Sequence, residues 1–147
     1  MIMSEPRELL IEAKVENLPA VNEFVASLLE PFNCPVKVQL QLDLVVEEIF
    51  VNIASYAYGD SVGKALLRGR TYDNPQSLEL SFIDEGIPYN PLQREAPDPD
   101  TPLLDRELGG WGIFLVKKNV DNISYEYKDG KNILTIRKNI IMQENEN

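Results

Sequence analysis

Histidine is absent from this chain of 147 residues, and cysteine occurs once, at Cys34. Without histidine, the chain cannot build a Ser-His-Asp or Cys-His catalytic arrangement, a histidine-based zinc site or a phosphohistidine of its own. A single cysteine excludes an internal disulfide and suits a reducing compartment. We therefore interpret Cys34 as a small buried hydrophobic residue rather than as a nucleophile.

Positive charge and long apolar runs are also scarce. The 14 Lys and Arg residues stand against 24 Asp and Glu, which gives a formal net charge of -10. This balance argues against nucleic acid and anionic membranes as partners, because phosphate binding needs clustered basic residues. No apolar run approaches the roughly 20 residues that span a bilayer, and the N-terminus lacks a signal-peptide pattern. We expect a soluble, cytoplasmic protein in which backbone amides, local dipoles or a metal ion hold any anionic ligand.

Length and a hydrophobic content of 44% predict a single globular domain over residues 1–147. Hydrophobic periodicity and turn residues predict strands at 7–15, 64–73, 77–83, 122–127 and 132–137, and helices at 18–30, 36–58 and 110–119. Asp129-Gly130 predicts a type I′ turn between the last two strands. The proline-rich stretch of about 86–108 reads as a lid, and residues 142–147 as a frayed tail.

The order of these elements predicts the fold class. Consecutive strands cannot be joined by helical crossovers, so we expect a mixed, largely antiparallel sheet with three helices on one face, a two-layer α/β sandwich. The first strand leaves two alternatives open. Its edge could pair with a second copy in a homodimer, or charges at Glu12, Lys14 and Glu16 could protect it from pairing.

Three short motifs carry residues suited to chemistry. Glu48 and Asn52 are four residues apart, so they share one face of the predicted helix. A carboxamide oxygen is a suitable ligand for Mg²⁺, and a carboxylate beside it can take a proton from a hydroxyl. Asp84 follows an apolar strand, where its carboxylate can accept a hydrogen bond from a ring amine, and Gly86 allows close backbone approach. Each motif alone is also typical of an ordinary polar helix edge or a plain turn.

The third motif is a group of glycines, Gly109, Gly110 and Gly112, before an apolar helix. Free amides and the helix dipole at such an N-terminus favour phosphate, although a simple hinge or cap has the same composition. The combination is more specific than its parts, because each motif lies on the element type that its chemistry needs. Together the motifs predict a nucleotide-sized pocket.

At this point the chain resembles the histidine-kinase-like ATPase superfamily, and within it the stand-alone anti-sigma-factor serine/threonine kinases, the RsbW-like group. The resemblance extends from about Arg7 to Lys138. It includes the phrases LDLVVEEIFVNIASYAYGD, IDEGIPYNP, GGWGIFLVKK and YEYKDGKNILTIRK. It implies a Bergerat-type ATP-binding fold with an ATP lid, with ATP and Mg²⁺ as cofactors.

The resemblance also implies roles for single residues. Glu48 would be the catalytic general base and Asn52 the Mg²⁺ ligand. Asp84 would bind the adenine amino group, and Gly86 would line the adenine pocket. The glycines of the third motif, Gly109, Gly110 and Gly112, would shape the lid hinge and meet the phosphates.

The implied activity is phosphorylation of a serine on a small anti-anti-sigma partner of the STAS type, with a sigma factor as a second partner. The chain departs from the family pattern near the phosphates. Ser55 and Tyr56 stand where relatives often have basic residues, and the lid is rich in acidic residues. These departures favour an alternative, a regulatory protein that binds ATP or ADP and holds its partner without phosphorylating it.

Overall fold

The computed structural model describes residues 3–93 and 112–141. Five strands form one sheet in the order β1-β2-β3-β5-β4. The strands are β1 (Arg7–Glu12), β2 (Lys64–Asp73), β3 (Gln76–Asp84), β4 (Asn122–Lys128) and β5 (Lys131–Asn139). Every pairing within this sheet is antiparallel, so the expected fold class is confirmed and the described sheet contains no parallel pair.

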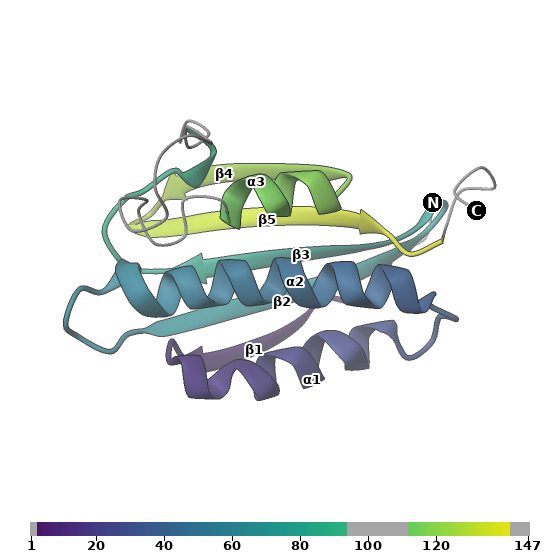
Figure 1. Ribbon diagram of the computed structural model, residues 1–147, viewed down its shortest axis with the longest axis horizontal. Helices are drawn as coiled ribbons and strands as arrows, with labels where there is room; N and C mark the ends of the chain where they lie inside the picture. Colours follow the sequence, from purple (N-terminus) through teal and green to yellow (C-terminus); the bar gives the residue numbers. More distant parts are fainter. Residues whose placement is uncertain (1–2, 94–111, 142–147) are drawn as a thin grey trace, which may run out of the picture.

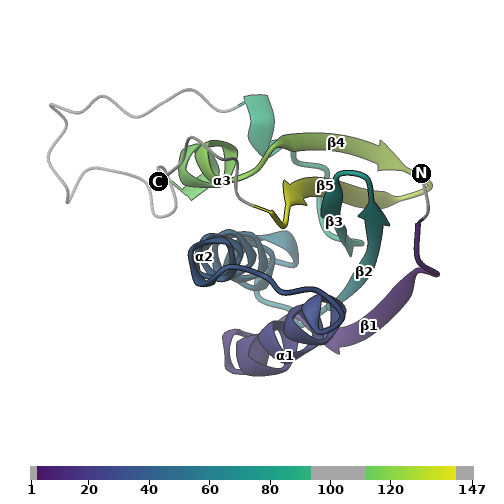
Figure 2. The same cartoon turned by 90° about the vertical axis from the view of Figure 1, so that its right-hand side faces the viewer.

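Three helices cover one face of the sheet, as Figures 1 and 2 show. They are α1 (Leu18–Leu29), α2 (Val36–Asn52) and α3 (Gly112–Asn119). A π-helical turn at Ile53–Ala57 continues α2 and reaches a residue with positive φ at Gly59. Because glycine adopts that conformation without a steric penalty, Gly59 suits the turn that follows this long helix.

The core lies between the helices and the sheet. Alternate residues of β3, namely Leu78, Leu80 and Phe82, are at most 1% exposed and belong to this core. The apolar stripe of α1 is buried at Val21, Val25, Leu28 and Leu29. The apolar faces of the helices and of the sheet thus pack together in one layer. This layer holds the ends of α2, α3, β3 and β5 in fixed relative positions.

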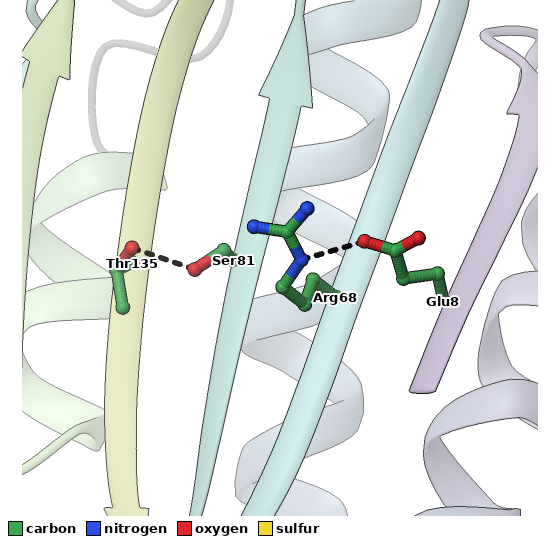
Figure 3. A network of polar contacts seen from close by, with 4 residues as sticks. All are labelled: Glu8, Arg68, Ser81 and Thr135. Atoms are coloured by element: carbon green, nitrogen blue, oxygen red, sulfur yellow. Dashed lines mark hydrogen bonds and ion pairs between the residues drawn. The ribbon is translucent and has the colours of Figure 1, made fainter. Parts of the chain in front are cut away.

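The opposite face of the sheet is polar over part of its width (Figure 3). Arg68 of β2 donates to the Glu8 carboxylate of β1 at 2.6 Å, and the Ser81 and Thr135 hydroxyls of β3 and β5 are hydrogen-bonded at 2.8 Å. The Glu8–Arg68 pair is about half exposed, so it contributes little stability. No helix covers this face in the described residues.

Two expectations differ from the structure or lie beyond it. The first strand was expected to reach Val15, but β1 ends at Glu12, and Val15 is 54% exposed at the start of a 3₁₀ turn. Alternation predicted the longer strand, but β2, its pairing partner, begins at Lys64 opposite Glu12. Beyond that pair, one further backbone hydrogen bond joins the two segments, from the Ala13 amide to the Gly63 carbonyl at 2.8 Å. Of the expected lid, only 86–93 falls in the described residues, and the tail at 142–147 lies outside them. No described helix combines the length and apolar character needed to cross a bilayer.

Candidate functional site

A cavity of about 490 Å³ lies between the C-terminal half of α2, the helix α3 and the strands β3, β4 and β5. Its volume is in the range of small-molecule and cofactor sites. Apolar side chains form most of its wall: Ile49, Ile53, Phe82, Ile87, Ile113, Val116 and Leu134. The polar groups are few and come from Asn52, Asp84, Asn132 and three tyrosines, Tyr56, Tyr89 and Tyr125. Among the described lining residues none is basic.

Asp84 is the charged residue among the described residues that line this cavity. It is the last residue of β3 and only 7% exposed. Its Oδ1 accepts hydrogen bonds from the Gly86 amide at 2.9 Å and from Asn132 Nδ2 at 2.9 Å. Both of these bonds end on one oxygen of the carboxylate, which leaves the other oxygen for a donor in the cavity. A ring amine would be such a donor, and the role of Asp84 in binding the adenine amino group stays a prediction.

Asn132 is the residue that the sequence analysis missed. It lies directly opposite Asp84 in the β3–β5 register and is 7% exposed. Its Nδ2 also donates to the Ile87 carbonyl at 2.9 Å, and its Oδ1 accepts from the Tyr89 amide at 3.1 Å and from the Tyr125 hydroxyl. Burial raises the pKa of Tyr125, which keeps that hydroxyl protonated as a donor. Nothing in the local sequence after the Asp129-Gly130 turn distinguishes Asn132 from an ordinary polar strand residue.

Gly86 is required by close packing against the end of the long helix. A Cβ at this position would come within 2.2 Å of the Ala57 carbonyl oxygen, which is backbone and cannot move aside cheaply. The next amide, that of Ile87, donates to the same carbonyl at 3.0 Å. The Asp84–Gly86 turn therefore packs directly against the π-helical turn after α2.

Tyr58 also connects the end of the long helix to the turn after β3. Its hydroxyl donates to the Lys64 carbonyl at 2.5 Å and accepts from the Glu85 amide at 2.8 Å. Its ring occupies the space beside Gly63, where a Cβ would lie 2.2 Å from the ring. Tyr58 thus sets the position of Glu85, next to Asp84, relative to α2.

Glu48, Asn52 and Gly112 lie together where α3 begins. A Cβ on Gly112 would be 2.3 Å from Glu48 Oε2 and 3.9 Å from Asn52 Nδ2. The glycine therefore leaves room for the Glu48 carboxylate beside the first turn of α3, and Asn52 lines the cavity one helical turn further along α2. Of the sequence-predicted residues, Asn52 and Asp84 line the cavity, Glu48 and Gly112 lie next to each other beside Asn52, and Gly86 packs against Ala57. Gly109 and Gly110 lie outside the described residues.

The Glu48 carboxyl is partly buried, and this changes its acidity. Burial raises the pKa of Glu48, and the neighbouring Glu47 carboxylate raises it further. A raised pKa makes the ionised carboxylate a stronger proton acceptor than a solvated glutamate. The position is therefore chemically suited to a general base.

The donor set also fits a magnesium nucleotide. No group of three or more His, Cys, Asp or Glu side chains that could hold a metal by itself occurs in the described part of the chain. Mg²⁺ does not need such a cage, because it is commonly bound by one or two protein oxygens, several waters and the phosphates of its nucleotide. Asn52 lines the cavity, and its Oδ1 would supply a neutral hard oxygen.

The helix α3 carries two lysines. Lys117 and Lys118 lie in the last turn of α3, and neither lines the cavity. The Lys117 ammonium lies over the Phe114 ring, 5.3 Å from its centroid. The positive charge of α3 is thus at the end of the helix away from Gly112.

Asn132→Ala is expected to lower the free energy of unfolding by about 2 kcal/mol, because the change leaves buried partners of Asn132 without a hydrogen bond. Urea denaturation measures this loss. Asn122→Ala, at an exposed position on β4, is the matched control and should change the free energy of unfolding by less than about 0.5 kcal/mol. Equal stabilities for the two variants would show that the Asn132 network contributes nothing.

Comparison with known proteins agrees with this geometry. Residues 11–138 match the family model of the histidine kinase-like ATPase domain. The chain is 28% identical over 100 residues to the serine/threonine-protein kinase BtrW of Bordetella bronchiseptica, which covers 68% of this chain and 70% of that protein.

Two solved structures share the fold. The RsbU and RsbW domains of Rv1364c from Mycobacterium tuberculosis match 95% of this chain with a TM-score of 0.66 at 13% identity. The blue-light activated histidine kinase EL346 of Erythrobacter litoralis matches 74% with a TM-score of 0.51 at 18% identity. The chain spans 34% and 32% of those two solved chains. The family match, which covers most of the chain and includes the strands and helices that enclose the cavity, shows that this protein belongs to the histidine kinase-like ATPase domain family.

Proposed function

We propose that this protein is a Mg-ATP-dependent serine/threonine protein kinase of the anti-sigma type. Its substrate would be a small anti-anti-sigma partner of the STAS type, and it would also sequester a sigma factor. The observation that carries this proposal is the position of Gly112. The start of α3 packs against Glu48 and Asn52, beside the cavity that contains Asp84. The name of the Bordetella relative, a serine/threonine-protein kinase, supports the reaction class.

The proposal assigns one task to each part of the cavity. Asp84 accepts a hydrogen bond from the adenine amino group at its free oxygen, and Gly86 lets the base approach the backbone. The apolar walls and the tyrosines enclose the base, because aromatic faces and aliphatic side chains both pack well against a flat ring. Asn52 would hold the metal, and Gly109, Gly110 and Gly112 are the residues assigned to the phosphates.

Glu48 acts on the protein substrate. Its carboxylate takes the proton of the acceptor serine hydroxyl while the γ-phosphoryl group is transferred to that oxygen, the bond from the γ-phosphorus to the β–γ bridging oxygen breaks, and ADP leaves. Bound Mg²⁺ would neutralise charge on the phosphate oxygens during this step. Phosphoryl transfer depends mostly on positioning and electrostatic stabilisation, so the raised basicity of Glu48 and its fixed place beside Gly112 are the properties that matter.

One observation favours a second function. The described lining of the cavity contains no Lys or Arg, and Ser55 and Tyr56 follow the proposed metal ligand on the helix. Weak electrostatic stabilisation of the transferring phosphoryl group would slow the reaction far more than it would weaken nucleotide binding. The second candidate is therefore a regulator that binds ATP or ADP and holds a protein partner without phosphorylating it.

Incubation with Mg-ATP labelled on the γ-phosphate and a STAS-type protein from the same genome tests the proposal. We expect label on a serine of the STAS protein. Nucleotide binding without labelled protein, across the STAS proteins of the genome, would favour the regulator. Absence of nucleotide binding in the same preparation would contradict both candidates.

We also take residues 1–147 to act as one domain in the cytoplasm, with a lid over the nucleotide at about 86–108. Limited proteolysis with and without Mg-ATP tests the lid. Nucleotide should protect cleavage sites in this stretch, and equal cleavage in both states would argue against a lid.

A further inference from the structure

A second, smaller cavity lies at the other end of α2 and α3 from the nucleotide cavity. Its volume is about 180 Å³, and it is lined by the start of α2, the end of α3 and the end of β5. Figure 1 shows where these three elements lie in the fold. Three lysines from these three elements surround it, namely Lys37, Lys118 and Lys138. This grouping is unusual in a chain with 14 basic and 24 acidic residues.

The single acidic residue among the described lining is already used within the protein. Asp121 Oδ2 accepts a hydrogen bond from the Asn139 amide at 2.7 Å, and this bond connects the start of β4 with the end of β5. Lys138 has interactions of its own and acts electrostatically on the Cys34 thiol. The local positive charge that faces the cavity therefore rests on Lys37 and Lys118, both exposed.

Exposed aliphatic side chains lie on or directly after two of the elements that carry the lysines. Val36 and Leu40 are 70% and 64% exposed and lie one turn apart on the same side of α2, and Lys37 follows Val36 in the sequence. Ile141, which lines the cavity, is 51% exposed. A cationic hollow beside large exposed aliphatic side chains is typical of a protein-binding surface, whereas a free small anion would make no use of the apolar part.

We propose that this surface, defined by Lys37, Lys118, Val36, Leu40 and Ile141, docks an acidic amphipathic segment of a protein partner. A carboxylate of the segment enters the lysine cavity, and its apolar side chains cover the aliphatic residues. The cavity admits a carboxylate but is smaller than the roughly 300 Å³ at which ligand pockets begin. The inference deepens the proposed function, since it gives the protein partner a binding place separate from the nucleotide cavity.

The test is a nuclear magnetic resonance titration of the full chain with a short synthetic helix-forming peptide that carries Glu and Leu on one face. Two further probes are the same peptide with Gln in place of Glu, and inorganic phosphate. We expect the Glu peptide to shift the amide signals of Lys37, Gln41, Val120 and Ile141, and the Gln peptide to bind about fivefold or more weakly. Added salt should weaken the Glu peptide further.

Lys37→Glu supplies the decisive variant. A carboxylate near the N-terminus of α2 is stabilised by the helix dipole, so the variant should fold at least as well as the wild type. Its affinity for the Glu peptide should fall about fivefold or more. Lys128→Glu, an equal change of charge on an exposed position of β4, should bind the peptide as the wild type does.

Equal binding by the Lys37 and Lys128 variants, or shifts elsewhere on the surface, would overturn the proposal. Shifts with phosphate alone would overturn it in favour of a small-anion site. ATP titration of the Lys37 variant separates this inference from the proposed function. If the Lys37 variant binds ATP as the wild type does but no longer binds the peptide, the docking surface is supported. If the wild type does not bind ATP, only the proposed function is contradicted.

Discussion

Glu48→Gln is expected to lower phosphoryl transfer to the protein partner by about 10²- to 10⁴-fold, while ATP affinity stays within about twofold of the wild type. Glutamine keeps the shape of the side chain beside Gly112 but cannot take a proton. Single-turnover transfer and calorimetric ATP titration measure the two quantities. The matched control is Glu47→Gln, which removes the same charge from the adjacent exposed position and should transfer normally.

The pH dependence supplies a second readout for Glu48. Burial, and then Glu47, raise the pKa of Glu48, so transfer should decline as the pH falls through this raised pKa, above the range of a solvated glutamate. Stability changes in the opposite direction. Because the folded state binds this proton more tightly than the unfolded state does, Glu48 contributes stability at low pH that is lost as the pH rises through the folded pKa. Glu48→Gln should therefore be no less stable than the wild type at neutral pH.

Unchanged transfer in the Glu48→Gln variant would remove Glu48 from the role of general base. A marked loss of stability at neutral pH would instead show that the carboxylate is held by favourable contacts. Equal defects in the Glu47 and Glu48 variants would indicate a general charge effect of α2.

Asn52→Ala is expected to weaken Mg-ATP binding by about 10- to 100-fold, since a lost contact to a charged group corresponds to about 1.5–3 kcal/mol. Calorimetric titration with ATP and ADP in the presence of Mg²⁺ measures this change. The expected effect depends on the metal, so the wild type and the variant should differ much less when the metal is chelated. Ser55→Ala, three residues along the same helical segment and exposed, is the control and should bind Mg-ATP normally.

A difference between wild type and Asn52→Ala that persists without metal would assign Asn52 to the nucleotide itself rather than to Mg²⁺. Equal affinities in the presence of metal would contradict both roles. No binding by the wild type would show that the cavity serves another ligand.

Local patterns in the sequence predicted most of the framework. The bounds of β2 agree with the predicted strand at 64–73, and α2 with its π-helical turn covers nearly all of the helix predicted at 36–58. Asp129 and Gly130 both have positive φ, as their expected turn type requires. These features depend on periodicity and on residues with special backbone preferences, which act over a few neighbouring positions. The spacing of Glu48 and Asn52 on one helical face belongs to the same class.

The sheet register and the packing of helix ends were decided only by the tertiary structure. Asn132 meets Asp84, 48 residues earlier, because β3 pairs with β5 in that register, and no local signal in the sequence specifies that partner. The same is true of Gly86 against Ala57 and of Gly112 against Glu48, where the absence of a side chain has meaning only beside the neighbour. The sequence by itself determined the elements and the residue types of the site, since these follow from local backbone and side-chain chemistry. Only the long-range burial of apolar surface, which sets how the elements pack, decided which of those residues share one cavity.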